Sequence, residues 1–241
     1  MKRLSAVHRH TAVFGGALFL LVLLFMSRVL WLPAGQALGG LDARGLFYPW
    51  LSFAREAVWH GRMPLWDANH FAGYPFLSNP QVAFFYPPTW LALLLPVRFG
   101  LTAINMLHIW LAGMGTYLFL RQQKATPVPA ALAGLTFAFS GFTAVRLFAG
   151  HLGFLGVHAW LPWLLLATQW AFARPDWKRG VLAGLPFGLA ILAGHTTSLI
   201  YVGLAWLAYA GFLAATTRRW QLALRQMLFI GVVGLGVSAV Q

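Results

Sequence analysis

Seven apolar runs, separated by short polar segments, dominate the pattern of this chain. A transmembrane helix needs about 20 mostly apolar residues to cross a hydrocarbon core of about 30 Å, and most of the runs approach that length. The runs cover residues 11–32, 101–120, 129–148, 154–173, 180–194, 199–215 and from about 224 onward. We therefore predict an all-α integral membrane protein with about seven transmembrane helices.

The segment 33–100, between the first two runs, has a different pattern. After Pro49, apolar side chains recur between residues 50 and 57 at the spacing of one helical face. This predicts an amphipathic helix of about 12 residues that begins at Pro49, ends at Gly61 and lies in the membrane interface. A second apolar stretch, 89–97, is bounded by Pro88 and Pro96 and is too short to span. We therefore expect a long first loop that contains interfacial helices.

The composition agrees with a membrane protein and excludes several other classes. Hydrophobic residues make up 60% of the chain, charged residues 9%, and the mean hydropathy is +0.71, which leaves too few polar residues to cover a soluble globule. The net charge of +13 comes from short clusters between apolar runs, so it reports topology and no nucleic-acid partner is expected. The absence of Cys excludes disulfides, thiolate catalysis and Cys-ligated zinc.

The basic residues predict the orientation of the chain. Eleven of the 17 Lys and Arg residues fall on one side of the predicted spans: Lys2, Arg3, Arg9, Arg121, Lys124, Arg174, Lys178, Arg179, Arg218, Arg219 and Arg225. This places the N-terminus in the cytoplasm and segment 33–100 outside it. Because the last apolar run stops without a polar flank, we expect residues 1–241 to be a single transmembrane domain from the N-terminal part of a longer protein.

Three of the four acidic residues lie in the first loop: Asp42, Glu56 and Asp67. A carboxylate near the membrane surface can act as a general base or a metal ligand. Each acid also has a structural alternative. Asp42 can cap a helix or pair with Arg44, Glu56 can form a surface salt bridge, and Asp67 can close the turn after Trp66.

Arg146, His151 and His195 lie near the predicted outer ends of later spans. Cations at this level can bind a phosphate leaving group. The alternatives are a headgroup anchor for Arg146 and a hydrogen-bonded interfacial histidine for His195. The pair Ser140-Gly141 is expected to be a packing contact or a kink within a span.

Several short motifs occur together along the chain: an acid shortly after the first span, then FYPW, GRMPLWD, FAGYP, NPQVAFFYPP, FAFSGF, AWLPWLL and AGH. Together they resemble the bacterial YfhO-type family of membrane proteins, which belongs with the GT-C glycosyltransferases. The resemblance implies a multi-span helical body, a first extracytoplasmic loop with an essential acid, and a sugar donor carried on a polyprenyl phosphate.

Carried over to this sequence, the resemblance implies that Asp42 is the general base that activates an acceptor hydroxyl. Two positions depart from the family pattern. Ala43 follows Asp42 where many related enzymes have a second acid, and Asp67 stands in PLWD where the family usually has PLWN. Apart from the resemblance, the candidate substrate-binding residues follow from their position on the predicted outer side: Arg146, His151, His195, Arg44, Glu56 and Asp67. The metal ligands stay unknown, and no cofactor is assigned, although a divalent cation stays an open alternative.

These observations predict a glycosyltransferase of a bacterial cytoplasmic membrane. It would move a sugar from a polyprenyl-phosphate donor in the membrane lipid to a cell-envelope glycan or polymer on the outer side. The alternative is a non-catalytic binding or transport protein for lipid-linked saccharides, although the predicted spans hold few ionisable residues of the kind that transporters use. A third alternative is a membrane-surface scaffold for a protein partner.

Overall fold

The computed structural model describes residues 2–33, 36, 38–70, 72–173 and 176–240, and it is almost entirely helical. The elements in chain order are α1 (Lys2–Phe25), α2 (Ser27–Leu30), the π-helical segment η1 (Ala43–Phe47), α3 (Tyr48–Trp59), β1 (Trp66–Asp67), β2 (Tyr74–Pro75), the 3₁₀ turns η2 (Phe76–Ser78), η3 (Pro80–Val82) and η4 (Pro87–Thr89), α4 (Trp90–Leu94), α5 (Val97–Gln122), α6 (Pro127–Ala138), α7 (Gly141–Ala149), α8 (Leu152–Ala173), α9 (Trp177–Leu192), α10 (Thr196–Thr217) and α11 (Trp220–Ser238).

Among the described residues, six helical stretches are long and apolar enough to cross a membrane, as expected for a multi-pass membrane protein. They are Val7–Phe25, Val97–Gln122, Pro127–Ala149, Leu152–Ala173, Thr196–Thr217 and Trp220–Ser238. The run predicted as a further span at 180–194 is the helix α9, whose 16 residues extend about 24 Å at 1.5 Å per residue. That is shorter than a hydrocarbon core of about 30 Å.

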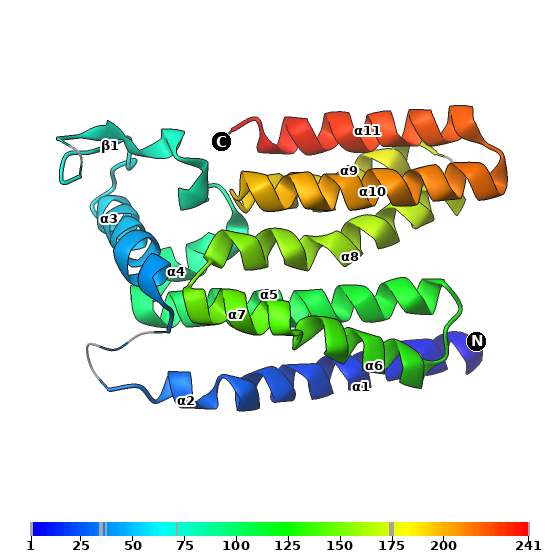
Figure 1. The fold of residues 1–241 in the computed structure, drawn as a ribbon, viewed down its shortest axis with the longest axis horizontal. Helices are drawn as coiled ribbons and strands as arrows, with labels where there is room; N and C mark the ends of the chain where they lie inside the picture. The colour runs from blue at the N-terminus through cyan, green and yellow to red at the C-terminus, as the bar shows by residue number, and fades with distance from the viewer. Residues whose placement is uncertain (1, 34–35, 37, 71, 174–175, 241) are drawn as a thin grey trace.

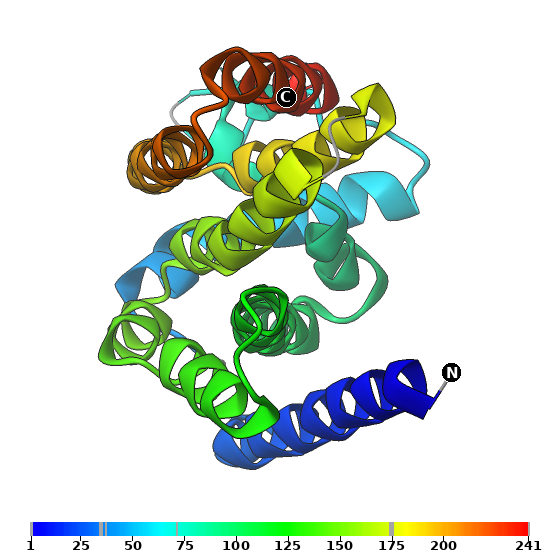
Figure 2. The same ribbon diagram turned by 90° about the vertical axis from the view of Figure 1, so that its right-hand side faces the viewer.

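The long helices run side by side, and α5 lies in the middle, packed against α1, α6 and α8 (Figures 1 and 2). α9 packs closely on α11, because Gly180, Gly184 and Gly188 face α11 at a spacing of four residues. A methyl group added at any of the three would come within 3 Å of an atom of α11. Small residues allow this close approach of helices in an apolar environment, where packing rather than hydrophobic burial holds them together.

The two ends of the bundle differ in composition. α3, α4 and the short β1–β2 pair lie at one end, and the N-terminus and the α5–α6 and α10–α11 turns lie at the other (Figure 1). The second end holds most of the basic clusters named above, such as Arg121 with Lys124 and Arg218 with Arg219. Arg174, one of the basic residues named above, falls outside the described residues. The helical path thus separates the acid-bearing loop from the basic turns.

The segment between α1 and α5 agrees with the sequence in its main helix and corrects the start of that helix. α3 has 12 residues and ends just before Gly61, as expected. Pro49 does not begin the helix, however, because helical backbone runs from Leu41 through η1 into α3. Proline has no N–H to donate, and the π-helical turn immediately before it changes the hydrogen-bond spacing there.

Two predicted spans also differ in detail. The run at 129–148 is broken at Ser140, whose Oγ accepts a hydrogen bond from the backbone N–H of Thr143 at 3.3 Å and caps α7. Ser140 therefore marks a kink, as one alternative predicted. The second span begins at Val97 rather than at residue 101, which shortens the loop by a few residues.

Candidate functional site

Asp42 lies where the helical run toward α3 begins, on a segment held tightly against the turn between α7 and α8. A methyl group on Gly150 would come within 2.6 Å of the Ala43 backbone nitrogen, and one on Gly40 within 2.7 Å of the Phe148 carbonyl oxygen. Gly150 also has φ +82°, a left-handed conformation that glycine adopts without strain. The backbone contact therefore brings Asp42 to residues more than a hundred positions away in sequence.

The carboxylate of Asp42 is the end of a short hydrogen-bonded chain. His151 Nε2 lies 3.1 Å from Asp42 Oδ2, and Arg146 Nη1 lies 3.0 Å from His151 Nδ1. A guanidinium can only donate, so Nδ1 of His151 must accept and the proton of the neutral ring lies on Nε2. His151 then donates to Asp42. The side chain of Asp42 is 44% exposed, so it also remains accessible to a ligand.

Aromatic rings support the cationic end of this chain. The guanidinium carbon of Arg146 lies 4.2 Å from the centre of the Phe154 ring and 5.3 Å from that of Phe142. Cations are attracted to the faces of aromatic rings at such distances. The Phe154 ring also contacts His151, at 5.2 Å between centroids, and His195, at 3.6 Å. Three of the predicted substrate-binding residues, Arg146, His151 and His195, thus gather around Phe154.

His195 has a structural role that follows from its protonation state. Its Nδ1 accepts the backbone N–H of Ser198 at 3.2 Å and caps the N-terminus of α10. Burial lowers the pKa of His195 below its ordinary value of 6.5, and repulsion by the positive charge of His151, when that ring gains a second proton, and of Arg146 lowers it further. The ring is therefore neutral at pH 7 and able to accept this bond.

The loop is anchored to the bundle at two further points. Gly194, with φ +79°, lies so close to the Pro80 carbonyl group that no side chain fits there. The Tyr86 hydroxyl lies 2.8 Å from His108 Nε2 on α5 and accepts a hydrogen bond from Trp160 Nε1 on α8 at 2.7 Å. Tyr86 belongs to the FYPP motif, so that motif fixes the loop into the bundle core.

Arg44 and Glu56 lie apart from the Asp42–His151 contact. Arg44 is exposed and lines a cavity of about 570 Å³ together with Tyr48 and Arg98. Glu56 is exposed on α3, and its carboxylate forms no ion pair within the described part of the chain. The surface salt bridge expected for Glu56 is therefore absent from the described residues, and Asp42 pairs with His151 rather than with Arg44.

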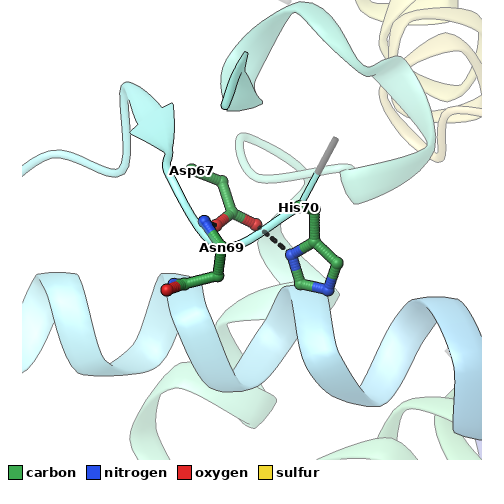
Figure 3. A network of polar contacts seen from close by, with 3 residues as sticks. All are labelled: Asp67, Asn69 and His70. Carbon is green, nitrogen blue, oxygen red and sulfur yellow. Dashed lines mark hydrogen bonds and ion pairs between the residues drawn. The ribbon is translucent and has the colours of Figure 1, made fainter. Parts of the chain in front are cut away.

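Asp67 is fully buried and closes a turn (Figure 3). Its Oδ2 lies 2.7 Å from His70 Nδ1, and its Oδ1 accepts the backbone N–H of Asn69 at 2.9 Å. Asp67 also pairs with Tyr74 across the two short strands. These contacts give the carboxylate a structural role, as the turn-closing alternative predicted, and among the described residues no hydrogen bond or ion pair joins Asp67 to Asp42.

The sequence did not single out Phe154, His158 or Ser198, which surround Arg146 and His195 in the structure. Two spacings in the sequence could have indicated His158 and Ser198. His158 follows His151 by seven residues, which puts both on one face of a helix, and Ser198 is the third residue of α10 after His195. Groups of three or more His, Asp or Glu side chains suited to a metal ion are absent from the described residues.

Comparisons with other proteins leave the geometry as the basis for any assignment. No family model, curated protein or solved structure matches this chain.

Proposed function

We propose that this chain is a GT-C-like membrane glycosyltransferase of the YfhO type with Asp42 as its general base. The observation that carries the proposal is the hydrogen-bonded chain from Arg146 through His151 to Asp42. It supplies a half-exposed carboxylate, fixed in orientation by a neutral histidine, beside a cation. A base and a cation close together are what transfer from a phosphate leaving group requires.

The proposed reaction is a direct displacement at the anomeric carbon of the donor sugar. The acceptor hydroxyl oxygen forms a bond to that carbon, and the bond from the carbon to the lipid phosphate oxygen breaks with its electron pair. The hydroxyl proton passes to Asp42. Arg146, which has further N–H groups beside the one on His151, stabilises the negative charge of the departing lipid phosphate.

His151 acts on the reaction through Asp42. Because His151 donates from Nε2, it holds the carboxylate of Asp42 in one orientation. The other lone pairs of the carboxylate stay free to take the proton of the acceptor hydroxyl. In this proposal His151 and Arg146 together position Asp42, and Arg146 also contacts the lipid phosphate. These steps proceed with Asp42 and Arg146 alone, without a divalent cation.

The topology completes the proposal. With α9 as a seventh, shorter span, the chain crosses a bacterial cytoplasmic membrane seven times with its N-terminus in the cytoplasm. Segment 33–100 then lies outside, where Asp42 meets an extracytoplasmic glycan or polymer acceptor and the polyprenyl-phosphate sugar arrives through the membrane. The accumulation of basic turns at the end of the bundle opposite the loop supports this orientation (Figure 1).

The test is the substitution Asp42→Asn in the full-length protein, assayed for sugar transfer from a polyprenyl-phosphate donor. Removing a general base lowers rates by about 10²–10⁴-fold, so transfer should fall to that extent while membrane insertion is unchanged. Glu56→Gln, which neutralises another acid of the same loop, is the matched control and should keep its rate. Full activity of Asp42→Asn would refute the assignment, and donor binding without transfer by the unmodified protein would favour the binding or transport alternative.

A further inference from the structure

A pocket of about 190 Å³ lies between α7, α8 and α10, and Arg146 lines it. Its polar lining consists of Arg146, His158 and Ser198. Its apolar lining includes the rings of Phe142, Phe154 and Tyr201. Acidic side chains are absent from its described lining, so the pocket is electrostatically suited to an anion.

Two polar atoms of the pocket are buried without a partner in the described structure. Ser198 is only 7% exposed and its Oγ makes no hydrogen bond, while the Nε2 of His158 is buried between the rings of Phe137 and Phe142 and makes none either. Buried polar atoms are nearly always hydrogen-bonded in native proteins. Two residues that line one pocket thus each carry a buried polar atom without a partner, which points to a ligand with polar atoms of its own.

The lining favours a phosphate over other polar groups. Arg146 carries five N–H donors, of which one nitrogen is engaged with His151, and Ser198 adds a hydroxyl donor. Ser198 also lies in the first turn of the 22-residue helix α10, where the partial positive charge of the helix favours an anion. Neutral His158 with its proton on Nε2 would add a further donor.

The position of the pocket favours a phosphate that belongs to a lipid. Phe142 is 40% exposed and Tyr201 66% exposed, on helical stretches that are long and apolar enough to cross a membrane. The exposed side of the pocket therefore faces the hydrocarbon. Arg146 lies three residues before the end of α7 and Ser198 is the third residue of α10, so both lie within about 5 Å of a helix end, at the depth of lipid headgroups.

We propose that this pocket binds the phosphate of a single membrane lipid that enters between α7 and α10, and that the bound phosphate shares the Arg146 guanidinium with His151. A phosphate forms a charge-assisted bond to a guanidinium, which is stronger than the bond that a neutral imidazole accepts. Because one guanidinium then serves both partners, occupancy changes the Arg146–His151 contact and, through it, the setting of Asp42. The pocket would couple the binding of a lipid phosphate to the orientation of the Asp42 carboxylate. Because the role of Asp42 as a base comes from the proposed function, this coupling rests on the proposed function.

The experiment measures binding without any sugar. The intact chain in a phosphate-free maltoside detergent is titrated with hexadecyl phosphate, with hexadecanol and with inorganic phosphate, and thermal stability and the ¹⁵N signals of the His151 ring are recorded. Hexadecyl phosphate should raise the melting temperature and shift the His151 signals, and the other two should do neither. If hexadecanol binds equally well, the claim that the pocket recognises a phosphate is wrong. If inorganic phosphate binds equally well, the claim that the phosphate belongs to a lipid is wrong. Unchanged His151 signals on binding would overturn the coupling.

Two variants test the residues. Ser198→Ala and His158→Phe remove the unpartnered atoms, and Phe keeps a ring stacked on Phe137, so the melting temperature without ligand should not fall. Each should weaken binding of hexadecyl phosphate about tenfold, the usual effect of one lost hydrogen bond to an anion. Thr197→Ala, at an exposed position in the same turn, is the control and should bind normally.

Unchanged affinity in both variants would refute the pocket. These binding experiments are independent of the sugar-transfer assay. A chain that binds hexadecyl phosphate as expected but transfers no sugar would refute the proposed enzyme and leave the lipid-phosphate pocket supported.

Discussion

The contact between Gly150 and the Asp42 segment can be tested without any assumption about function. In Gly150→Ala the new methyl group meets two obstacles: the left-handed backbone, at φ +82°, and the Ala43 backbone nitrogen, 2.6 Å away. A left-handed conformation costs a non-glycine residue about 1–2 kcal/mol, and overpacking of a tight contact costs about 1–3 kcal/mol. The expected loss of stability is therefore about 2–5 kcal/mol.

The assay for Gly150→Ala is thermal unfolding of the purified chain in detergent. For a protein of this size 1 kcal/mol corresponds to about 2–4 °C, so the melting temperature should fall by about 4–20 °C. Gly45→Ala is the matched control, because a methyl group at Gly45 meets no atom within 4 Å and the helical position favours alanine. If both variants melt at the same temperature, the described packing of the loop on the α7–α8 turn is wrong.

Two further predictions concern single side chains. Because the pKa of His195 is lower in the folded chain than its ordinary value of 6.5, the unfolded chain binds more protons as pH falls below about 6.5, and stability should be lost in that range. His195→Asn, which keeps an N-cap acceptor without titrating, should flatten the dependence of melting temperature on pH between 7.5 and 5, and an identical slope would contradict the pKa argument. Asp67→Asn should lower the free energy of unfolding by about 1–2 kcal/mol, because it weakens the buried hydrogen bond to His70. The melting temperature should fall while sugar transfer is unchanged. Loss of transfer at full stability would instead give Asp67 a functional role.

Local patterns predicted the helices well because each depends on neighbouring residues. The apolar runs correspond to the long helices, and the helical spacing after Pro49 corresponds to the 12-residue helix α3. The start of that helix was missed because its π-helical turn has no sequence signature in the apolar spacing. The apolar run at 180–194 corresponds to α9, whose 16 residues contain Pro186 and are short for a span.

The candidate site depended on contacts that sequence spacing cannot give. Composition placed Asp42, Arg146 and His151 on one side of the predicted membrane, but the 3.1 Å contact between Asp42 and His151 depends on the glycine packing at Gly150. Asp67 and Asp42 look alike as loop acids, and only the structure separates a buried turn-closing carboxylate from a half-exposed one. The pairing of a side chain with distant partners is a property of the tertiary packing.

The π-helical turn Ala43–Phe47 makes the number of residues in this segment as important as their identity. Each residue advances a helix by roughly 100° around its axis, so the turn sets the angle between Asp42 and the buried face of α3. Removal of one residue from the turn would allow an ordinary α-helix and would rotate Asp42 away from His151, although every side chain of the site would still be present. Substitution at the exposed Gly45, in contrast, leaves that angle intact. The segment thus acts as a spacer whose length, more than its composition, determines where the carboxylate points.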